Sequence, residues 1–296
     1  MKSGFVAIIG KPNAGKSTLL NTLVGEKVSI VSWRPQTTRN KITGILHGED
    51  FQIVFTDTPG LLNGTTGLAK YMIESISGAT KDVDAIVYVV DGEKHMPQEE
   101  LAIIEKYRKR ATVIVAVNKT DVANRGVLLE TLGKLNTIKD LTVVPLSAKK
   151  SDNIDVLIKE LLPLLSDGIA FYPEDMVTDK PLRFMVAEII REKSLKFLQE
   201  EIPHGIGIEI NKYEVRDDGL NYVEASIICE KETHKSIIIG KGGEMIKKIA
   251  TAARKEAEEL VGDRVFMKLW VKVKSGWKDN NRLLINLGYD PKDLKD

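Results

Sequence analysis

A phosphate-binding loop is indicated by the stretch Gly10, Lys11, Pro12, Asn13, Ala14, Gly15, Lys16, Ser17 and Thr18. It fits the pattern G-x-x-x-x-G-K-[ST] and lies between an apolar run at residues 5–9 and a helical segment that begins near Thr18, which is the context this motif needs. Its glycines let backbone N–H groups turn inward at a helix N-terminus, where the helix dipole also favours negative charge. Lys16 would reach the β- and γ-phosphates of a nucleotide, and the Ser17 hydroxyl would bind Mg²⁺.

A second group of polar residues follows the strand-like run 51–56 and reads Asp57, Thr58, Pro59 and Gly60. The Asp57 carboxylate is placed to hold the magnesium ion, and the Gly60 N–H can approach the γ-phosphate. An ordinary turn has the same composition. The phosphate-binding loop upstream is what favours the catalytic interpretation.

Two further strand ends carry polar residues suited to recognise a purine base. They are Asn118, Lys119 and Asp121 after the run 112–117, and Ser147, Ala148 and Lys149 after the run 142–145. The Asp121 carboxylate can accept hydrogen bonds from N1–H and the 2-amino group of guanine, whereas adenine has no 2-amino donor and an acceptor at N1. A buried carboxylate left unpaired is costly, so Asp121 would exclude ATP. Backbone N–H groups from Ser147 to Lys149 would reach the guanine O6.

Alternating strand-like and helix-like runs place these motifs at strand ends. The strand-like runs are residues 5–9, 43–47, 51–56, 85–90, 112–117 and 142–145. Helices are expected at residues 17–24, 66–80, 98–109, 125–135 and 153–164. The strands are rich in Val and Ile and nearly continuous, which is typical of a mostly parallel sheet covered by helices on both faces. We therefore predict a doubly wound α/β domain, whose ligands bind at the carboxyl ends of the strands.

The composition limits the choice of function. The chain has 296 residues with 43 basic and 42 acidic side chains, so a site for RNA or DNA would be a local patch. Cys229 is the one cysteine, which precludes an intrachain disulfide. The sequence shows neither a signal peptide nor a long apolar run. We expect a soluble, cytoplasmic, monomeric protein of two domains.

The four motifs in this order resemble the G domain of translation-factor-type GTPases, over roughly the first 165 residues. The resemblance implies that the protein binds GTP and Mg²⁺ and hydrolyses GTP to GDP, with two switch segments that respond to the γ-phosphate. The first switch would contain Pro35, Gln36, Thr37, Thr38 and Arg39, and the second would span residues 60–67. Thr38 would be a magnesium ligand beside Ser17 and Asp57, with Thr37 as the alternative. Lys16, Thr38 and Gly60 are the expected catalytic residues.

Leu61 is a departure from the Ras-like pattern, in which a glutamine at this place orients the attacking water. An apolar side chain cannot do so. The chain therefore resembles the GTPases with a hydrophobic residue here, which hydrolyse GTP slowly unless another group helps. Members of that group often use a potassium ion beside the phosphates, with an asparagine at the place of Asn13 as a ligand. Asn13 could instead hydrogen-bond within its own loop.

The pattern changes near Pro163, where Gly, Pro and polar residues replace the alternating runs. We predict a G domain at residues 1–165, an interdomain linker at 166–180 that permits domain motion, and a second domain at 181–296. The second domain shows a helix at 182–198, strands at 205–215 and 222–229, a glycine-bearing helical region that ends near residue 260, a strand at 265–273 and a final helix near 280–287.

This order, α-β-β-α-α-β, is that of the prokaryotic (type II) KH fold, a smaller α+β domain. Its RNA-clamping G-x-x-G loop would be Gly240, Lys241, Gly242 and Gly243, which lies between two helices and would hold about four nucleotides of RNA backbone. Neighbouring lysines supply local positive charge, although some of them only solvate the surface. The predicted RNA-binding residues are Lys235, Ile239, Gly240, Lys241, Gly242, Gly243, Lys247 and Lys248. A glycine-rich turn between helices is the alternative.

A single G domain with Leu61, followed by one KH domain, resembles the Era family of bacterial ribosome-assembly GTPases over essentially the whole chain. The resemblance implies binding to the 3′ end of small-subunit (16S) ribosomal RNA, a role in maturation of the small (30S) subunit, and in some members peripheral association with the inner membrane. We expect the GTP state to gate RNA binding. The rival hypothesis is a signalling or cell-cycle switch whose second domain contacts protein or membrane.

Overall fold

The computed structural model of the protein describes residues 1–34 and 36–294, so Pro35 of the predicted first switch lies outside the described residues. The chain forms two compact units. One comprises Met1–Asn63 and Met72–Asp179, and the other comprises Gly64–Tyr71 and Lys180–Asp296. The boundaries predicted for the G domain, the linker and the KH domain stay a prediction.

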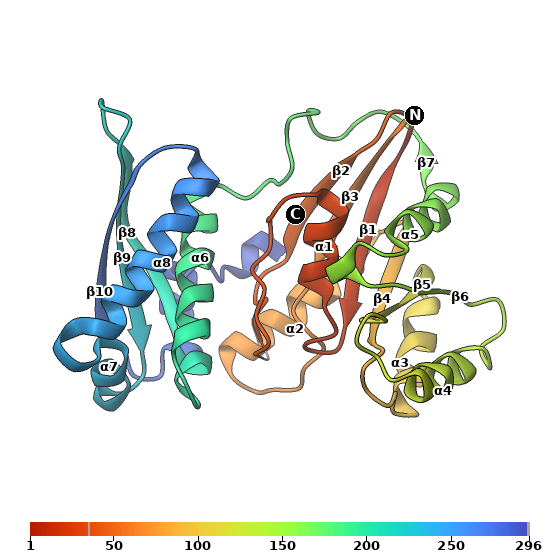
Figure 1. Ribbon diagram of the computed structural model, residues 1–296, viewed down its shortest axis with the longest axis horizontal. Coiled ribbons are helices and arrows are strands. Elements are labelled where there is room, and N and C mark those ends of the chain that lie inside the picture. Colours follow the sequence, from red (N-terminus) through yellow and green to blue (C-terminus); the bar gives the residue numbers. More distant parts are fainter. Residues whose placement is uncertain (35, 295–296) are drawn as a thin grey trace. The chain divides into compact units, whose positions relative to one another are not determined.

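The first unit is built on a seven-stranded sheet (Figure 1). Its strands are β1 (Lys2–Gly10), β2 (Ile42–His47), β3 (Phe51–Asp57), β4 (Ala85–Asp91), β5 (Thr112–Asn118), β6 (Thr142–Pro145) and β7 (Ser166–Asp167). The order is β2-β3-β1-β4-β5-β6, and all neighbours are parallel except β2 and β3. The short β7, which the sequence pattern did not predict, pairs antiparallel with the start of β1.

Helices cover both faces of this sheet. They are α1 (Lys16–Val24), α3 (Glu99–Arg108), α4 (Arg125–Leu135) and α5 (Ile154–Leu161), while α2 (Gly67–Ala79) begins in the second unit and continues into the first. Alternate strand residues such as Ile9 and Tyr88 pack with Ile104 of α3 and Leu135 of α4 on one face, and all four are almost fully buried. On the other face α1 packs on β1, β2 and β3, and α5 packs on β5 and β6. The predicted doubly wound fold is confirmed.

The chain after β7 is held on the edge of this sheet rather than free. The carbonyl of Val177 accepts a hydrogen bond from Ile45 N–H of β2 at 2.9 Å. The fully buried Gln52 amide donates to the Tyr172 carbonyl at 2.8 Å and accepts from the Phe171 N–H at 2.7 Å. Most of the predicted linker is therefore attached to the first unit in this structure.

The second unit contains a three-stranded sheet of order β10-β9-β8 with two helices across one face. Its elements are α6 (Leu182–Phe197), β8 (Gly207–Val215), β9 (Asn221–Cys229), α7 (Glu232–Ile239), α8 (Glu244–Val261), β10 (Val265–Val273) and α9 (Asn281–Asn286). β10 and β9 are parallel, and β8 and β9 are antiparallel. The predicted type II KH order is confirmed.

The core of the second unit lies between the helices and the inner face of the sheet. Ile189 and Ile190 of α6 and Ile249 and Ala253 of α8 pack on Val223 of β9, and all five are buried. The spacing of the two α8 residues, one turn apart, explains why this long helix lies flat on the sheet. Across the described residues, no helix is long and apolar enough to span a membrane.

Candidate functional site

The glycine-rich loop joins β1 to α1 as the motif predicts. Gly15 has φ 95° and caps the N-terminus of α1, and Asn13 also has a positive φ of 63°. A Cβ atom on Gly15 would collide with the amide of Asn118. Glycine is therefore required here both by the backbone conformation and by the neighbouring side chain.

Lys16 is buried at the first position of α1, and its Nζ donates a hydrogen bond to the Lys11 carbonyl at 3.1 Å. Burial lowers the pKa of Lys16 to about 8, while the negative charge of Asp57 raises it. A buried ammonium group aimed into a loop of backbone N–H groups favours an anionic ligand such as a phosphate.

The Ser17, Thr38 and Asp57 side chains meet at the end of β3. Ser17 Oγ donates to Asp57 Oδ2 at 2.6 Å and lies 2.8 Å from Thr38 Oγ1. Among the described residues, the second oxygen of the fully buried Asp57 has no hydrogen-bond partner. Burial raises the pKa of Asp57, whereas Lys16 and the hydroxyl hydrogen bonds lower it. Two hydroxyls and a carboxylate with one unpaired oxygen form a donor set of the kind that Mg²⁺ prefers.

The two threonines of the first switch point in different directions. Thr38 Oγ1 lies 3.3 Å from Asp57 Oδ2, whereas Thr37 Oγ1 donates to the Arg34 carbonyl at 2.6 Å within its own loop. This geometry favours Thr38 over the alternative, Thr37. The sequence analysis missed Ser29, whose buried hydroxyl donates to Asp57 at 3.1 Å. No motif surrounds Ser29, so the sequence carries no signal for it.

The start of the second switch lies against the phosphate-binding loop. A Cβ atom on Gly60 would lie 2.8 Å from the backbone of Pro12, and the Leu61 N–H donates to the Gly10 carbonyl at 3.1 Å. The Leu61 side chain packs against the apolar cluster under α3 and α4. The Thr58 hydroxyl donates to the Ile8 carbonyl at 2.9 Å, which ties this segment to β1.

Asn118 joins three loops of the site. Its amide nitrogen donates to the Ala14 carbonyl at 2.9 Å, and its amide oxygen accepts from the backbone N–H groups of Lys119 at 2.8 Å and Ala148 at 3.0 Å. The side chain is almost completely buried. Asn118 is thus a positioning residue that holds the phosphate loop and both predicted base-recognition segments together.

Asp121 and Ser147 lie together, with Ser147 Oγ donating to Asp121 Oδ1 at 2.7 Å. Asp121 itself is exposed, which differs from the buried carboxylate that the sequence argument assumed. Selection of guanine over adenine by Asp121 would therefore require the bound base to cover the carboxylate and shield it from water. The Ser147 and Ala148 N–H groups donate to Asp152 and Asn118, so the Lys149 N–H is the best placed of the three for the guanine O6.

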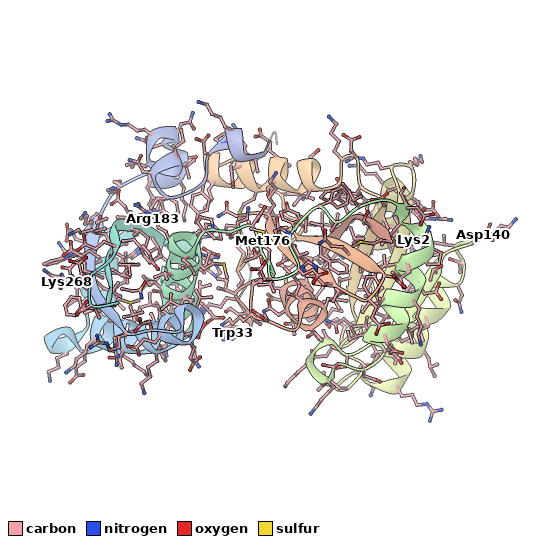
Figure 2. All side chains as sticks on the ribbon, turned by 90° about the horizontal axis from the view of Figure 1, so that it is seen from above. Lys2, Trp33, Asp140, Met176, Arg183 and Lys268 are labelled. Carbon is pink, nitrogen blue, oxygen red and sulfur yellow. The ribbon has the colours of Figure 1, made fainter. Side chains whose placement is uncertain are left out.

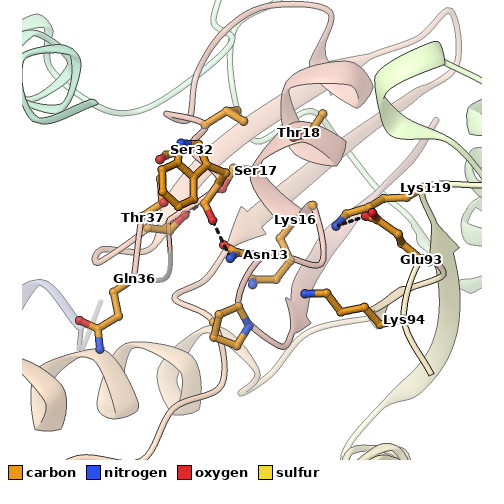
Figure 3. Close-up of a pocket in the computed structure, with 16 residues that line it drawn as sticks. Asn13, Lys16, Ser17, Thr18, Ser32, Gln36, Thr37, Glu93, Lys94 and Lys119 are labelled. Atoms are coloured by element: carbon orange, nitrogen blue, oxygen red, sulfur yellow. Dashed lines mark hydrogen bonds and ion pairs between the residues drawn. The ribbon is translucent and has the colours of Figure 1, made fainter. Parts of the chain in front are cut away.

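A pocket of about 450 Å³ lies between the phosphate loop, the residues around the first switch and Lys119 (Figure 3). Lys16, Lys94 and Lys119 line it, together with Thr18 and Glu93. Lys119 Nζ lies 2.8 Å from Asp91 Oδ2 and 3.6 Å from Glu93 Oε2, which fixes its side chain along one wall. The excess of positive charge suits a nucleotide polyphosphate.

Asn13 reaches across this pocket to the residues just before the predicted first switch. Its hydrogen bond leaves its own loop, whereas the potassium role stays a prediction. Its Nδ2 donates to the carbonyl oxygen of Trp33 at 2.7 Å, twenty residues away, as Figure 3 shows. The Trp33 side chain is 71% exposed, and the Arg34 guanidinium lies 4.4 Å from the centre of its ring. The amide of Asn13 and the Trp33 carbonyl therefore meet beside the phosphate loop.

The GKGG loop joins α7 to α8. Gly240 has φ 74°, and a Cβ atom there would lie 2.8 Å from Cβ of Met245. Gly242 and Gly243 also have positive φ values, 60° and 83°, but open space surrounds their Cα atoms. Two glycines that no described residue crowds leave room for a nucleic-acid backbone to come close.

The predicted RNA-binding lysines do not all gather at this loop. Lys241 lies within it, and the partly exposed Lys235 on α7 pairs with Glu232 at 3.7 Å. Lys247 and Lys248 line a shallow hollow that also contains Phe197 of α6, and the Lys248 ammonium lies 4.5 Å from the Phe197 ring centre. Lys248 is thus on the flank of α8 that faces α6.

Comparison with known proteins gives the same two parts. Residues 5–119 match a family model described as a 50S ribosome-binding GTPase, and residues 201–278 match the KH domain model. Together with the site geometry, these matches define a P-loop GTPase that carries a KH domain.

The full chain is similar to GTPase Era of Clostridium acetobutylicum, with 47% identity over 291 residues that cover 97% of this chain and 98% of the relative. GTPase Era of Ruminiclostridium cellulolyticum is 43% identical, with 97% of each chain covered. The chain belongs to the Era family of GTPases. Its activity is the hydrolysis of GTP.

Two solved structures agree with this assignment. An Aquifex aeolicus Era variant bound to GDP·AlF4⁻ is 37% identical, covers 98% of this chain and 100% of its own, and has a TM-score of 0.93. Era in complex with MgGDPNP and nucleotides 1506–1542 of 16S ribosomal RNA has the same identity and TM-score, with 98% and 99% covered.

Proposed function

We propose that the protein is a GTP-gated RNA-binding enzyme that binds the 3′ end of 16S ribosomal RNA and acts in maturation of the small ribosomal subunit. The observation that carries the nucleotide half is the meeting of Ser17, Thr38 and Asp57 around an unpaired carboxylate oxygen. The RNA half rests on the open GKGG loop and on the relative that is complexed with nucleotides 1506–1542 of 16S ribosomal RNA.

In this mechanism Ser17, Thr38 and Asp57 would hold Mg²⁺, which would supply positive charge to the β- and γ-phosphates. Lys16 binds the same phosphates from the phosphate loop. The γ-phosphate would strengthen the hold of the site on Thr38, so its loss would favour release of the first switch. Asp121 and the Lys149 N–H select guanine, and Asn118 keeps their two loops in register with the phosphate loop.

Hydrolysis by the isolated chain should be slow because the Leu61 side chain is packed in an apolar cluster and cannot orient water. We propose that a potassium ion beside the phosphates supplies part of the missing charge stabilisation. Asn13 would be one ligand through its amide oxygen, Oδ1, and its Nδ2 could keep the hydrogen bond to the Trp33 carbonyl. Equal GTPase rates in potassium and sodium buffers, or an unchanged rate in Asn13→Ala, would argue against this role.

Gating of RNA binding by GTP is tested by measuring RNA affinity with GDP and with a non-hydrolysable GTP analogue. We expect tighter binding with the analogue and, by thermodynamic reciprocity, tighter analogue binding or faster hydrolysis with RNA present. Identical RNA affinities in the two states would leave a constitutive RNA-binding protein. The RNA half is tested separately by crosslinking to ribosomal RNA, which Gly242→Asp should abolish.

The place of action that we propose is the cytoplasm, on the 30S subunit, with the protein as a monomer that associates peripherally with the inner membrane. Size-exclusion chromatography with light scattering tests the monomer. Co-sedimentation with liposomes of anionic lipids tests the membrane association.

A further inference from the structure

The outer face of the three-stranded sheet, turned away from α6 and α8, carries aromatic side chains in solvent. Along β10, buried or partly buried residues alternate with exposed ones, and the exposed set includes Phe266, Lys268, Trp270 and Lys272. Phe266 is 47% exposed and Trp270 is 48% exposed. Figure 2 shows Lys268 on this outer side of the sheet.

Phe266 and Tyr222 form the centre of this surface. The two residues are paired across β10 and β9, and their rings are stacked with centroids 5.2 Å apart and an interplanar angle of 8°. The Arg216 guanidinium lies 4.3 Å from the centre of the Tyr222 ring. We call Tyr222, Phe266 and Trp270 the aromatic face. β10 is an edge strand, so the ring face of Phe266 that points away from Tyr222 has no neighbouring strand.

The same sheet shows what a covered outer surface looks like. Trp277 is fully buried, donates from Nε1 to the Gly205 carbonyl at 3.1 Å, and lies with Leu287 against Gly207 of β8. This chain therefore covers one end of its outer sheet surface and leaves the aromatic face in solvent. Large exposed aromatic groups on one surface are typical of a binding site rather than of a solvated strand.

The charges around the aromatic face identify the class of partner. Five basic side chains lie on or beside this surface. Lys212 and Arg216 lie at the Tyr222 ring, Lys268 lies at the Trp270 ring, and Lys272 and Lys274 pair with Glu209. Three acids pair with them at 2.9 to 4.0 Å, namely Glu209, Glu214 and Glu224. Lys268 lies 4.8 Å from the Trp270 ring centre. Flat rings interleaved with surplus cations match the bases and phosphates of unpaired RNA.

We propose that the aromatic face is a second RNA-binding site, which stacks unpaired nucleotides on the exposed rings of Phe266 and Trp270 without reading their sequence, while Tyr222 supports the Phe266 ring from behind. It is separate from the GKGG loop, since that loop belongs to the helical layer on the opposite face of the sheet. An RNA strand that leaves the loop reaches the aromatic face by passing around the edge strand β10. The inference deepens the proposed RNA-binding function and rests on it.

Trp270 supplies a local readout. In a full-length Trp33→Phe background, the remaining tryptophans are Trp270 and the buried Trp277. We expect a single-stranded adenylate decamer to quench the emission, and the change to disappear in Trp270→Phe. Phe266→Ala and Tyr222→Ala should each weaken decamer binding about tenfold. Val215→Ala, which removes an exposed apolar side chain from β8, is the matched control and should leave binding unchanged.

A duplex of the same length and an inorganic polyphosphate are the discriminating ligands, because neither offers an unstacked base. Quenching by either one equal to that by the decamer, or no quenching by the decamer, would overturn the proposal. The Gly242→Asp variant separates the two sites. If Gly242→Asp loses the ribosomal RNA crosslinking of the parent chain but the decamer never quenches Trp270, the aromatic face is not an RNA site and the proposed function stands. If the parent chain binds no RNA at all, both proposals fail.

Discussion

The protein contains two glycine-rich loops at helix N-termini, and they are built differently. In the phosphate loop, Gly15 is enclosed by the amide of Asn118, and Gly60 of the second switch lies against Pro12. In the GKGG loop, Gly242 has open space around it. The first loop is contacted by segments that are distant in the chain, namely Asn118 and the start of the second switch, while the second contacts the two helices that it joins, α7 and α8. The difference suits a small, fully enclosed phosphate on one side and a long RNA backbone on the other.

Asn118→Ala should have the largest effect, because it removes the side chain that encloses Gly15 of the phosphate loop. The buried Ala14 carbonyl and Ala148 N–H would lose their partner, so we expect the free energy of unfolding to fall by about 2–4 kcal/mol and GTP affinity by about 100-fold. Urea unfolding and titration with a fluorescent GTP analogue measure the two effects.

Asn124→Ala is the matched control because it removes an asparagine that caps α4 in the same unit. It should cost about 1 kcal/mol of stability and leave GTP affinity unchanged. An equal loss of GTP affinity in both variants would mean that Asn118 acts only through general stability.

Thr38→Ala tests whether the first switch belongs to the nucleotide network. We expect GTP hydrolysis with Mg²⁺ to fall about 10- to 100-fold, with GDP affinity nearly unchanged, because the γ-phosphate would strengthen the hold of the site on Thr38. Thr37→Ala, which removes a hydroxyl bonded to the Arg34 carbonyl, should change the rate only a few fold. Single-turnover rates decide between them, and the reverse order would assign the magnesium ligand to Thr37.

Gly240→Ala and Gly242→Ala test whether the first glycine of the GKGG loop is enclosed and the third is open to solvent. Both alanines would have a positive φ, which costs about 1–2 kcal/mol, but Gly240→Ala also crowds Met245 and should destabilise the protein more. Gly242→Ala should lower RNA affinity while most of the stability remains. Thermal unfolding with and without RNA distinguishes the two, and equal destabilisation would show that Gly242 is also enclosed.

Leu61→Ala should have the smallest effect. Because the side chain packs in an apolar cluster and its backbone N–H, which is retained, donates to Gly10, the GTPase rate should stay within about threefold of the parent. Multiple-turnover phosphate release provides the measurement. A tenfold loss would indicate that the Leu61 side chain itself shapes the catalytic site.

The sequence by itself determined the main helices and strands apart from β7, the order of the motifs and both fold classes. A phosphate loop is made of consecutive backbone N–H groups between a strand and a helix, so phosphate binding can be predicted from nine adjacent residues. The order of elements in the KH domain could also be predicted, because apolar residues recur with a different period in helices and in strands. The roles of individual site residues stay predictions, with geometry that favours several of them.

The tertiary structure decided what depends on residues that are distant in the chain. It turned Thr38 rather than Thr37 toward Asp57, made Asn118 a link between three loops, exposed Asp121, and added Ser29 to the Asp57 cluster. It also attached the segment after β7 to the edge of the sheet. Hydrogen bonds between segments tens of residues apart leave no local pattern, because the partners share only a position in space, and that position follows from the packing of the whole sheet.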